Sequence, residues 1–363
     1  MMVASVAVIA CVALTQPLHA PSMPYRSYPP CMDAGDMPLP PRLAGARPLT
    51  TTDSARHGIS LSVLKSIDEV SREAWDACAS NEDPFVLWGY LHALEVSKSV
   101  APETGWMPYH LVAHDDVSGT LIGAVPLYLK SHSFGEYVFD HSWARAYRST
   151  SVDLSGGGYY PKLQACIPFT PVSGARLLVA SCEESHGEGA DERRTTIRNT
   201  LARGLVALSE RLGVSSVHVT FGNRVGDGAA LGKAGFLPRI GVQYKWRNEG
   251  YKSFEDFLAS LKQRRRHAIR QERRKVHDAG VVVRRLRGHE ITPRYWDALF
   301  RFYGRTVEEK WGRGYLKRAF FDELGRDDAM LERSLLVVAE EAESGTVIAA
   351  ALNLLGDDCI YGR

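Results

Sequence analysis

The sequence YYPKLQACIPFTPVSGARLL, residues 159–178, decides the kind of sheet that this chain can form. Its aromatic and branched residues favour a strand, but Pro161, Pro168 and Pro171 interrupt it. Because proline cannot donate a hydrogen bond to a neighbouring strand, prolines within a β segment mark bulges or a sheet edge. We therefore expect the long β segment from Tyr159 to Val179 to be irregular.

The residues before this segment alternate between strand and helix patterns. Apolar residues recur at every second position in strands, and at every third or fourth position in helices. The expected elements are a strand at 59–65, helices beginning at Ser71 and Pro84, and a hairpin of strands 109–114 and 121–129.

The residues after this segment predict a helix, a strand, a short helix and a last strand. These elements cover 197–212, 217–221, 229–234 and 242–246, and Gly213 ends the first helix. The whole order, with an irregular third strand, is that of the GNAT acyltransferase fold. We therefore expect an α/β chain with a mixed sheet of the GNAT type.

The same order begins again after a helix over 254–277. A strand is expected at 281–286, helices at 295–306 and 319–324, and a hairpin of 335–339 with 347–355. A repeat of about 220 residues is too long for a solenoid and fits a duplicated domain. Because the chain reaches Arg363 inside the expected third strand, we expect a tandem fold whose second copy is C-terminally truncated.

Composition narrows the class of protein. A chain of 363 residues with 44 Lys+Arg and 42 Asp+Glu has the size of two soluble domains. The net charge of +2 argues against nucleic-acid binding over the whole surface. Six scattered cysteines without a C-x-x-C pair argue against a disulfide scaffold, and we expect no metal site. The longest apolar run, 3–14, is too short to cross a bilayer, so no integral membrane span is expected.

Residues 1–57 are expected to be a targeting leader followed by a disordered proline-rich segment. The apolar start precedes eight prolines between Pro21 and Pro48, and such a stretch cannot bury enough surface to fold. We expect import into an organelle, first a plastid and next a mitochondrion, with the secretory pathway as the alternative. A wrongly extended gene start would explain the same residues.

The rest of the chain is expected to divide into three parts. These are a first domain at 58–250, a basic linker helix at 251–280 and a second domain at 281–363.

Four runs of sequence resemble a known family. They are PLYLKSHSFGEYVFDHSWARAY (126–147), the stretch quoted first, RRRHAIRQERRKV (264–276) and LNLLGDDCIYGR (352–363). They resemble the FemAB-like N-acyltransferases, which are related to the aminoacyl transferases that build peptidoglycan bridges and consist of tandem GNAT units. The resemblance implies transfer of an acyl or aminoacyl group to an amine. It also implies that the family continues beyond Arg363, with the donor site in the second unit.

Catalytic candidates lie between the hairpin and the irregular strand. Amide formation by this route needs a base for the amine and close placement of the two substrates. Glu136, Asp140 and His132 are the candidates, because their segment lies at the expected cleft. The competing interpretation is that these residues only cap and fix the loop.

Substrate-binding candidates follow on the irregular strand. Tyr160 and Lys162 share one strand face, and with Tyr159 they could hold an anionic or peptide-like acceptor. Arg176, after the turn that includes Thr170, could bind a carboxylate or phosphate with two hydrogen bonds. A half-buried edge strand and a surface ion pair are the plainer alternatives.

The helix at 254–277 carries the strongest local charge. Eight of the fourteen residues from Lys262 to Lys275 are Lys or Arg, and Glu272 is the sole acid. Apolar residues including Phe257 and Ile269 line the other face, so we expect that face to dock on protein. The basic face could bind the acceptor arm of tRNA, nucleotide phosphates or an anionic lipid surface, or could be a solvated linker. The candidates for binding a donor or another anion are Arg264, Arg265, Arg266, Arg270 and Arg273.

Two classes of function remain open. The first is an N-acyltransferase that uses acyl-CoA or aminoacyl-tRNA as a co-substrate and needs no permanently bound cofactor. Its acceptor would be a small-molecule, peptide or lipid-linked amine, and tRNA would be a possible partner. The second is a non-catalytic module that binds anions or nucleic acid through the basic helix.

Overall fold

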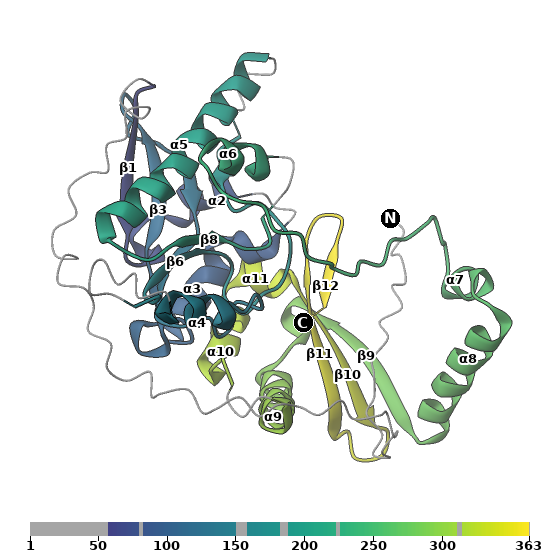
Figure 1. Cartoon of the computed structure of the whole chain (residues 1–363). Coiled ribbons are helices and arrows are strands. Elements are labelled where there is room, and N and C mark those ends of the chain that lie inside the picture. The colour runs from purple at the N-terminus through teal and green to yellow at the C-terminus, as the bar shows by residue number, and fades with distance from the viewer. Residues whose placement is uncertain are drawn as a thin grey trace.

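The computed structural model describes residues 57–79, 83–149, 158–181, 188–222, 226–310 and 314–362. It is a mixed α/β fold with antiparallel and mixed sheets (Figure 1). Apart from His57, the expected leader at 1–57 lies outside these described residues.

The first part of the chain forms two sheets and the helices around them. The strands are β1 (Ile59–Leu64), β2 (Trp106–Pro108), β3 (His110–Asp115), β4 (Leu121–Val125), β5 (Leu127–Lys130), β6 (Lys162–Ala165), β7 (Leu178–Val179) and β8 (Val217–Val219). The helices are α2 (Arg72–Cys78), α3 (Trp88–Val96), α4 (His141–Ser149), α5 (Glu188–Leu212) and α6 (Asp227–Lys233). One sheet has the order β1-β3-β4-β7 and the other β2-β5-β6-β8.

Prolines shape both sheets. The expected strand at 121–129 divides at Pro126 into β4 and β5, which belong to different sheets. The expected long segment at 159–179 is regular only in β6 and β7, and it crosses from one sheet to the other. The segment is therefore irregular, as its three prolines predicted.

The expected strand at 242–246 is wrong. Val242 is 81% exposed and Tyr244 98% exposed, and residues 236–249 contain no helix or strand. Alternating apolar residues define a face, but a strand also needs a neighbouring strand with which to pair. The described sheets supply none for this segment.

The expected single helix at 254–277 is also wrong in detail. It consists of α7 (Phe254–Ser260) and α8 (Gln263–Asp278), separated by Leu261, which is extended, and Lys262, which is not helical. Ser253 caps α7 by accepting a hydrogen bond from the backbone of Asp256.

The last part of the chain forms a third sheet. Its elements are β9 (Val281–Arg287), α9 (Pro293–Lys310), α10 (Arg318–Arg326), α11 (Asp328–Glu332), β10 (Ser334–Glu341), β11 (Val347–Leu355) and β12 (Ile360–Gly362). The order is β12-β11-β10-β9, and all neighbours are antiparallel.

The first and last parts share one hydrophobic core. Tyr90 of α3 meets Phe320 of α10 with ring centroids 5.6 Å apart, and Phe85 meets Tyr361 of β12 at 5.3 Å. A second core lies between α5 and the first two sheets. Among the described helices, none combines the length and the apolar character that crossing a membrane requires.

Candidate functional site

The site is built on two neighbouring strands. β5 and β6 are antiparallel, and Lys130 lies directly opposite Lys162 in their register. Both lysine side chains are fully buried. Two buried cations on one sheet face repel each other, so the fold needs carboxylates beside them.

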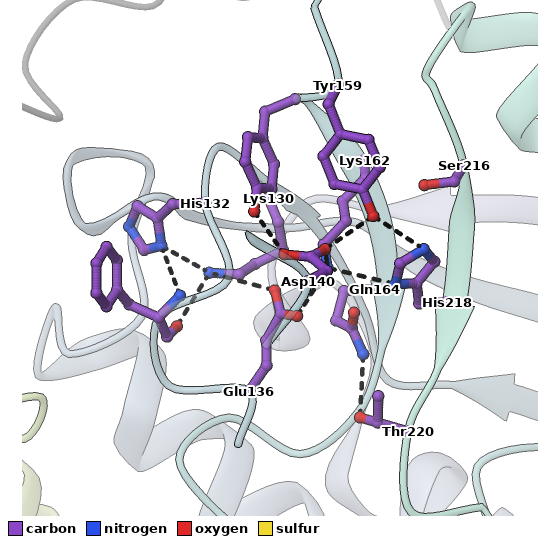
Figure 2. Close-up of polar contacts among 12 residues, drawn as sticks. Lys130, His132, Glu136, Asp140, Tyr159, Lys162, Gln164, Ser216, His218 and Thr220 are labelled. Atoms are coloured by element: carbon purple, nitrogen blue, oxygen red, sulfur yellow. Dashed lines mark hydrogen bonds and ion pairs between the residues drawn. The ribbon is translucent and has the colours of Figure 1, made fainter. Parts of the chain in front are cut away.

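The carboxylates come from the loop between β5 and α4. Lys162 Nζ donates to Glu136 Oε2 at 2.7 Å and to Asp140 Oδ2 at 2.5 Å (Figure 2). Glu136 Oε1 lies 4.0 Å from Lys130 Nζ. The loop therefore supplies two negative charges to two positive ones.

Two tyrosines complete the contacts of Asp140. Tyr159 OH donates to Asp140 Oδ2 at 2.9 Å, and Tyr160 OH donates to Asp140 Oδ1 at 2.6 Å. Tyr160 is half-buried, whereas Tyr159 is buried. Tyr160 thus extends from the surface to the buried carboxylate.

These contacts shift the pKa values of the acids in opposite directions. Burial raises the pKa of Glu136, although Lys162 and Lys130 oppose this effect. Burial also acts to raise the pKa of Asp140, but the hydrogen bonds from Lys162 and Tyr160 outweigh it and lower the pKa to about 2. Asp140 is therefore a fixed anion, and Glu136 is the carboxylate whose charge is easier to neutralise.

The surroundings of Lys130 are carbonyl oxygens and an aromatic face. Its ammonium lies 3.5 Å from the ring centroid of Trp106 and donates to Gly105 O at 3.2 Å and Phe134 O at 3.4 Å. Burial lowers the pKa of Lys130 to about 7, and Glu136 opposes this shift.

His132 lies on the Lys130 side of the site. Its Nδ1 accepts a hydrogen bond from the backbone N–H of Phe134 at 3.2 Å and lies 3.4 Å from Lys130 Nζ. Its Nε2 lies 3.1 Å from Thr104 O, which fits the neutral ring with the proton on Nε2. His132 thus packs beside Lys130, while Glu136 and Asp140 face Lys162 (Figure 2).

Three buried polar atoms near the charges lack a hydrogen-bond partner among the described residues: Glu136 Oε1, Gln164 Oε1 and Ser133 Oγ. Glu136 Oε1 is buried and has no hydrogen-bond partner among the described residues. A buried carboxylate oxygen without a donor is costly, and strain, a catalytic role or a bound water or ion can each account for one. The Lys130 ammonium is the cation that faces Glu136 Oε1, at 4.0 Å.

Sequence reasoning missed several residues that line the site. His218 of β8 has Nδ1 3.4 Å from Lys162 Nζ, and burial together with Lys162 lowers its pKa to about 4. Gln164 of β6 donates to Thr220 at 3.0 Å. The sequence signal for Gln164 is its spacing of two from Lys162, which places both on one face of the strand. His218 comes to the site only through the pairing of β6 with β8, which places it opposite Gln164.

Thr170 and Arg176 are placed away from these charges and inside the fold. Thr170 is buried with its hydroxyl 3.1 Å from Tyr90 OH. Arg176 is fully buried and donates to the carbonyls of Thr220, Ala175 and Val172. Its guanidinium also lies 4.0 Å from Asp83 Oδ2, so these contacts fit a structural role, and binding of a ligand anion by Arg176 stays a prediction.

The basic helix lies far from this cluster (Figure 1). Every α8 side chain is at least partly exposed, and Ile269 of its apolar face is partly buried, so docking of this face on protein stays a prediction. Only Leu258 of α7 is buried in this region. Arg270 pairs with Glu255, and the Arg273 guanidinium lies 4.3 Å from the centroid of the Phe254 ring. Arg264, Arg265 and Arg266 lie in the first turn of α8.

Comparison with known proteins places the chain in a family. Residues 66–363 match the FemAB-like family, which is described by the words peptidoglycan biosynthesis/recognition. A search of curated proteins finds no match. The family is related to the GNAT fold and supports a role of the aminoacyl-transferase type. Since the match covers most of the sequence, including the strands and the loop that form the site, this chain belongs to the FemAB-like family.

Proposed function

We propose that this chain transfers an acyl or aminoacyl group to an amine acceptor. The observation that carries the proposal is Glu136 Oε1, a buried carboxylate oxygen that lacks a hydrogen-bond donor. An acceptor amine can supply that donor. The family match supports the same class of reaction.

Each neighbouring group has a role in this proposal. Glu136 accepts a proton from the amine as the nitrogen attacks the donor carbonyl. A carbon–nitrogen bond forms, the ester or thioester bond breaks, and the proton leaves with the alcohol or thiol. Lys162 fixes Glu136 and Asp140, and Tyr160 guides the acceptor because it reaches the surface. A general base of this kind contributes about 10²–10⁴-fold to the rate.

The donor is an acyl-CoA or an aminoacyl-tRNA, and the acceptor is a small-molecule, peptide or lipid-linked amine. The site holds two cations and two carboxylates in close contact, so the charge of the cluster is balanced internally. An acceptor amine therefore enters as a neutral base, so that Glu136 stays ionised until the nitrogen attacks.

The second part of the proposal concerns a repeated unit. In the first part of the chain β1 pairs with β3 and β3 with β4, while α2 and α3 lie between β1 and β3 in sequence. In the last part β9 pairs with β10 and β10 with β11, with α9 to α11 between β9 and β10. We infer that 281–363 belongs to a second GNAT-like unit.

The test is an acyl-transfer assay on the full chain. The chain is incubated with a radiolabelled acyl-CoA or aminoacyl-tRNA panel and a mixture of amines, and labelled amide is measured. Glu136→Gln should lower kcat by about 10²–10⁴-fold, whereas Glu103→Gln, an exposed control, should not. Equal turnover in the two variants would remove Glu136 from catalysis, and absence of amide with every donor would overturn the transfer function.

A second candidate function rests on α8. All eight cations from Lys262 to Lys275 lie on a segment without a buried side chain, which suits binding of tRNA or another polyanion without catalysis. Reversing Arg264, Arg265 and Arg266 to Glu should weaken tRNA binding and flatten its salt dependence. A chain that binds tRNA with this salt dependence but yields no amide would favour the binding module.

The cellular site is also a proposal. The apolar and proline-rich character of residues 1–57 favours import into a plastid, then a mitochondrion, over the secretory pathway. A fluorescent fusion of these residues should enter an organelle. Diffuse cytosolic fluorescence would reject this proposal.

A further inference from the structure

Exposed apolar side chains gather beside the charged site. Phe139 is 51% exposed and Trp143 46% exposed, and the neighbouring Tyr137 and Val138 are also exposed. Four large apolar groups within seven residues are unusual on a solvated surface.

The buried charges explain why these side chains point outward. Glu136 and Asp140 are anchored in the core by Lys162, and they bracket residues 137–139. Tyr137 has a φ of 58°, and Gly135, two residues earlier, has a φ of 80°. Both residues are therefore in the left-handed region. A loop that is held at both ends by buried carboxylates presents its intervening residues to the surface.

A second exposed apolar segment adjoins the first. The Arg239 guanidinium lies 4.8 Å from the ring centroid of Trp143. Leu237 and Ile240 flank Arg239 and are both almost fully exposed. We call the six residues Tyr137, Val138, Phe139, Trp143, Leu237 and Ile240 the apolar lip.

The exposed charges within the two segments that carry the apolar lip have one sign. In the described residues of 131–149 and 226–247, the acids Glu136, Asp140 and Asp227 are all buried. The charged side chains that are exposed in these two segments are Arg145, Lys233, Arg239, Lys245 and Arg247. Arg239 lies over the Trp143 ring and Arg145 belongs to the same helix as Trp143, so a ligand surface that covers the apolar lip meets apolar side chains and these two cations.

We propose that the apolar lip and its surrounding cations bind the surface of an anionic lipid bilayer. Aromatic and aliphatic side chains enter the boundary between headgroups and acyl chains, while Arg and Lys contact anionic headgroups. Arg145 and Arg239 favour this partner, since anionic headgroups complement both cations while the acyl chains accommodate the apolar side chains. Bilayer binding is independent of acyl transfer, and its test needs no activity.

The first experiment is co-sedimentation of the full chain with vesicles. One set contains phosphatidylcholine alone and the other equal parts of phosphatidylcholine and phosphatidylglycerol. The chain should bind the anionic set, and Phe139→Ser combined with Trp143→Ser should weaken binding by about tenfold or more. Val282→Ser with Val283→Ser, at comparably exposed positions on β9, is the matched control and should bind as the wild type does.

The second experiment distinguishes the contribution of the apolar lip to vesicle binding from that of α8, which is also basic. Reversing Arg264, Arg265 and Arg266 to Glu should leave vesicle binding nearly unchanged. Trp143→Phe should keep binding but reduce the quenching of tryptophan fluorescence by brominated acyl chains, because Trp143 then no longer reports from the bilayer. Binding that depends on α8 alone, or equal quenching in Trp143→Phe, would overturn the proposal. Absence of vesicle binding, with a dimer that the lip variant dissociates, would assign the surface to a second copy instead.

Discussion

Lys130 and Lys162 face each other across β5 and β6, and each ammonium is removed from water. Two like charges at neighbouring positions of a sheet are destabilising unless other groups compensate them. Here the compensation comes from Glu136 and Asp140 in one loop. The loop that carries the proposed base is therefore also held in place by the charges of the sheet.

Replacing Lys162 by Met should strongly destabilise the fold. The change leaves Glu136 and Asp140 buried without their shared hydrogen-bond donor. Breaking one side of a buried ion pair costs about 3–5 kcal/mol. Urea unfolding of the variant should show a loss of this size.

The control for this change is Lys233→Met, at an exposed position in the last turn of α6. Its unfolding free energy should change by about 0.5 kcal/mol or less. A small loss in Lys162→Met as well would mean that water reaches the carboxylates and replaces the ammonium.

Lys130 should make stability rise with pH above neutrality. Its pKa is lowered from 10.5 to about 7 because burial disfavours the charged form. Between these two values the unfolded chain binds the proton that the folded chain has released, so the free energy of unfolding increases with pH. The largest slope from one proton is about 1.4 kcal/mol per pH unit. Stability measured from pH 7 to 9 should rise less in Lys130→Met than in the wild type, and identical slopes would show that Lys130 stays charged.

Part of the site could be predicted from the sequence because it lies in two short segments. Polar residues between a hairpin and an irregular strand indicated Glu136, Asp140, Tyr159, Tyr160 and Lys162, and the structure brings these five side chains together. That they act on a substrate stays a prediction.

The remainder depends on contacts between distant parts of the chain. Lys130 ends an apolar strand, and only the β5–β6 register reveals that it lies opposite Lys162. Arg176 follows a turn that suits a surface anion site, yet the chain folds it inward onto carbonyl groups. Residues 242–246 have the alternation of a strand without a sheet to join. The local sequence pattern gives a segment a preference for strand or helix. Whether the segment forms that element depends on strand pairing and burial, which involve residues far apart in the sequence.

Gly135 should not tolerate a side chain. Its φ is 80°, and an added Cβ would lie 2.6 Å from the ring of Phe169 and 3.2 Å from Trp106. Gly135→Ala should therefore cost about 1–3 kcal/mol more than strain alone. Gly119→Ala is the matched control, because its φ is 71° with open space around the added atom. Thermal unfolding of the two variants gives the comparison, and equal losses would show that the Phe169 ring moves aside.

Cleavage of the basic linker should leave the two parts of the chain associated. No α8 side chain is fully buried, so local opening costs little and its many Arg and Lys residues offer trypsin sites. The shared core, with Tyr90 against Phe320 and Arg72 hydrogen-bonded to Asp327 at 3.1 Å, should then hold the fragments together. A denaturing gel should show two fragments, whereas size-exclusion chromatography should show one species of the uncut size.

The double variant Phe320→Ala with Arg72→Ala tests whether the shared core holds the fragments together. It removes a ring from the core and an ion pair beside it, so the fragments of the cleaved variant should separate more readily. Separation of the wild-type fragments, or resistance of α8 to trypsin, would contradict this prediction.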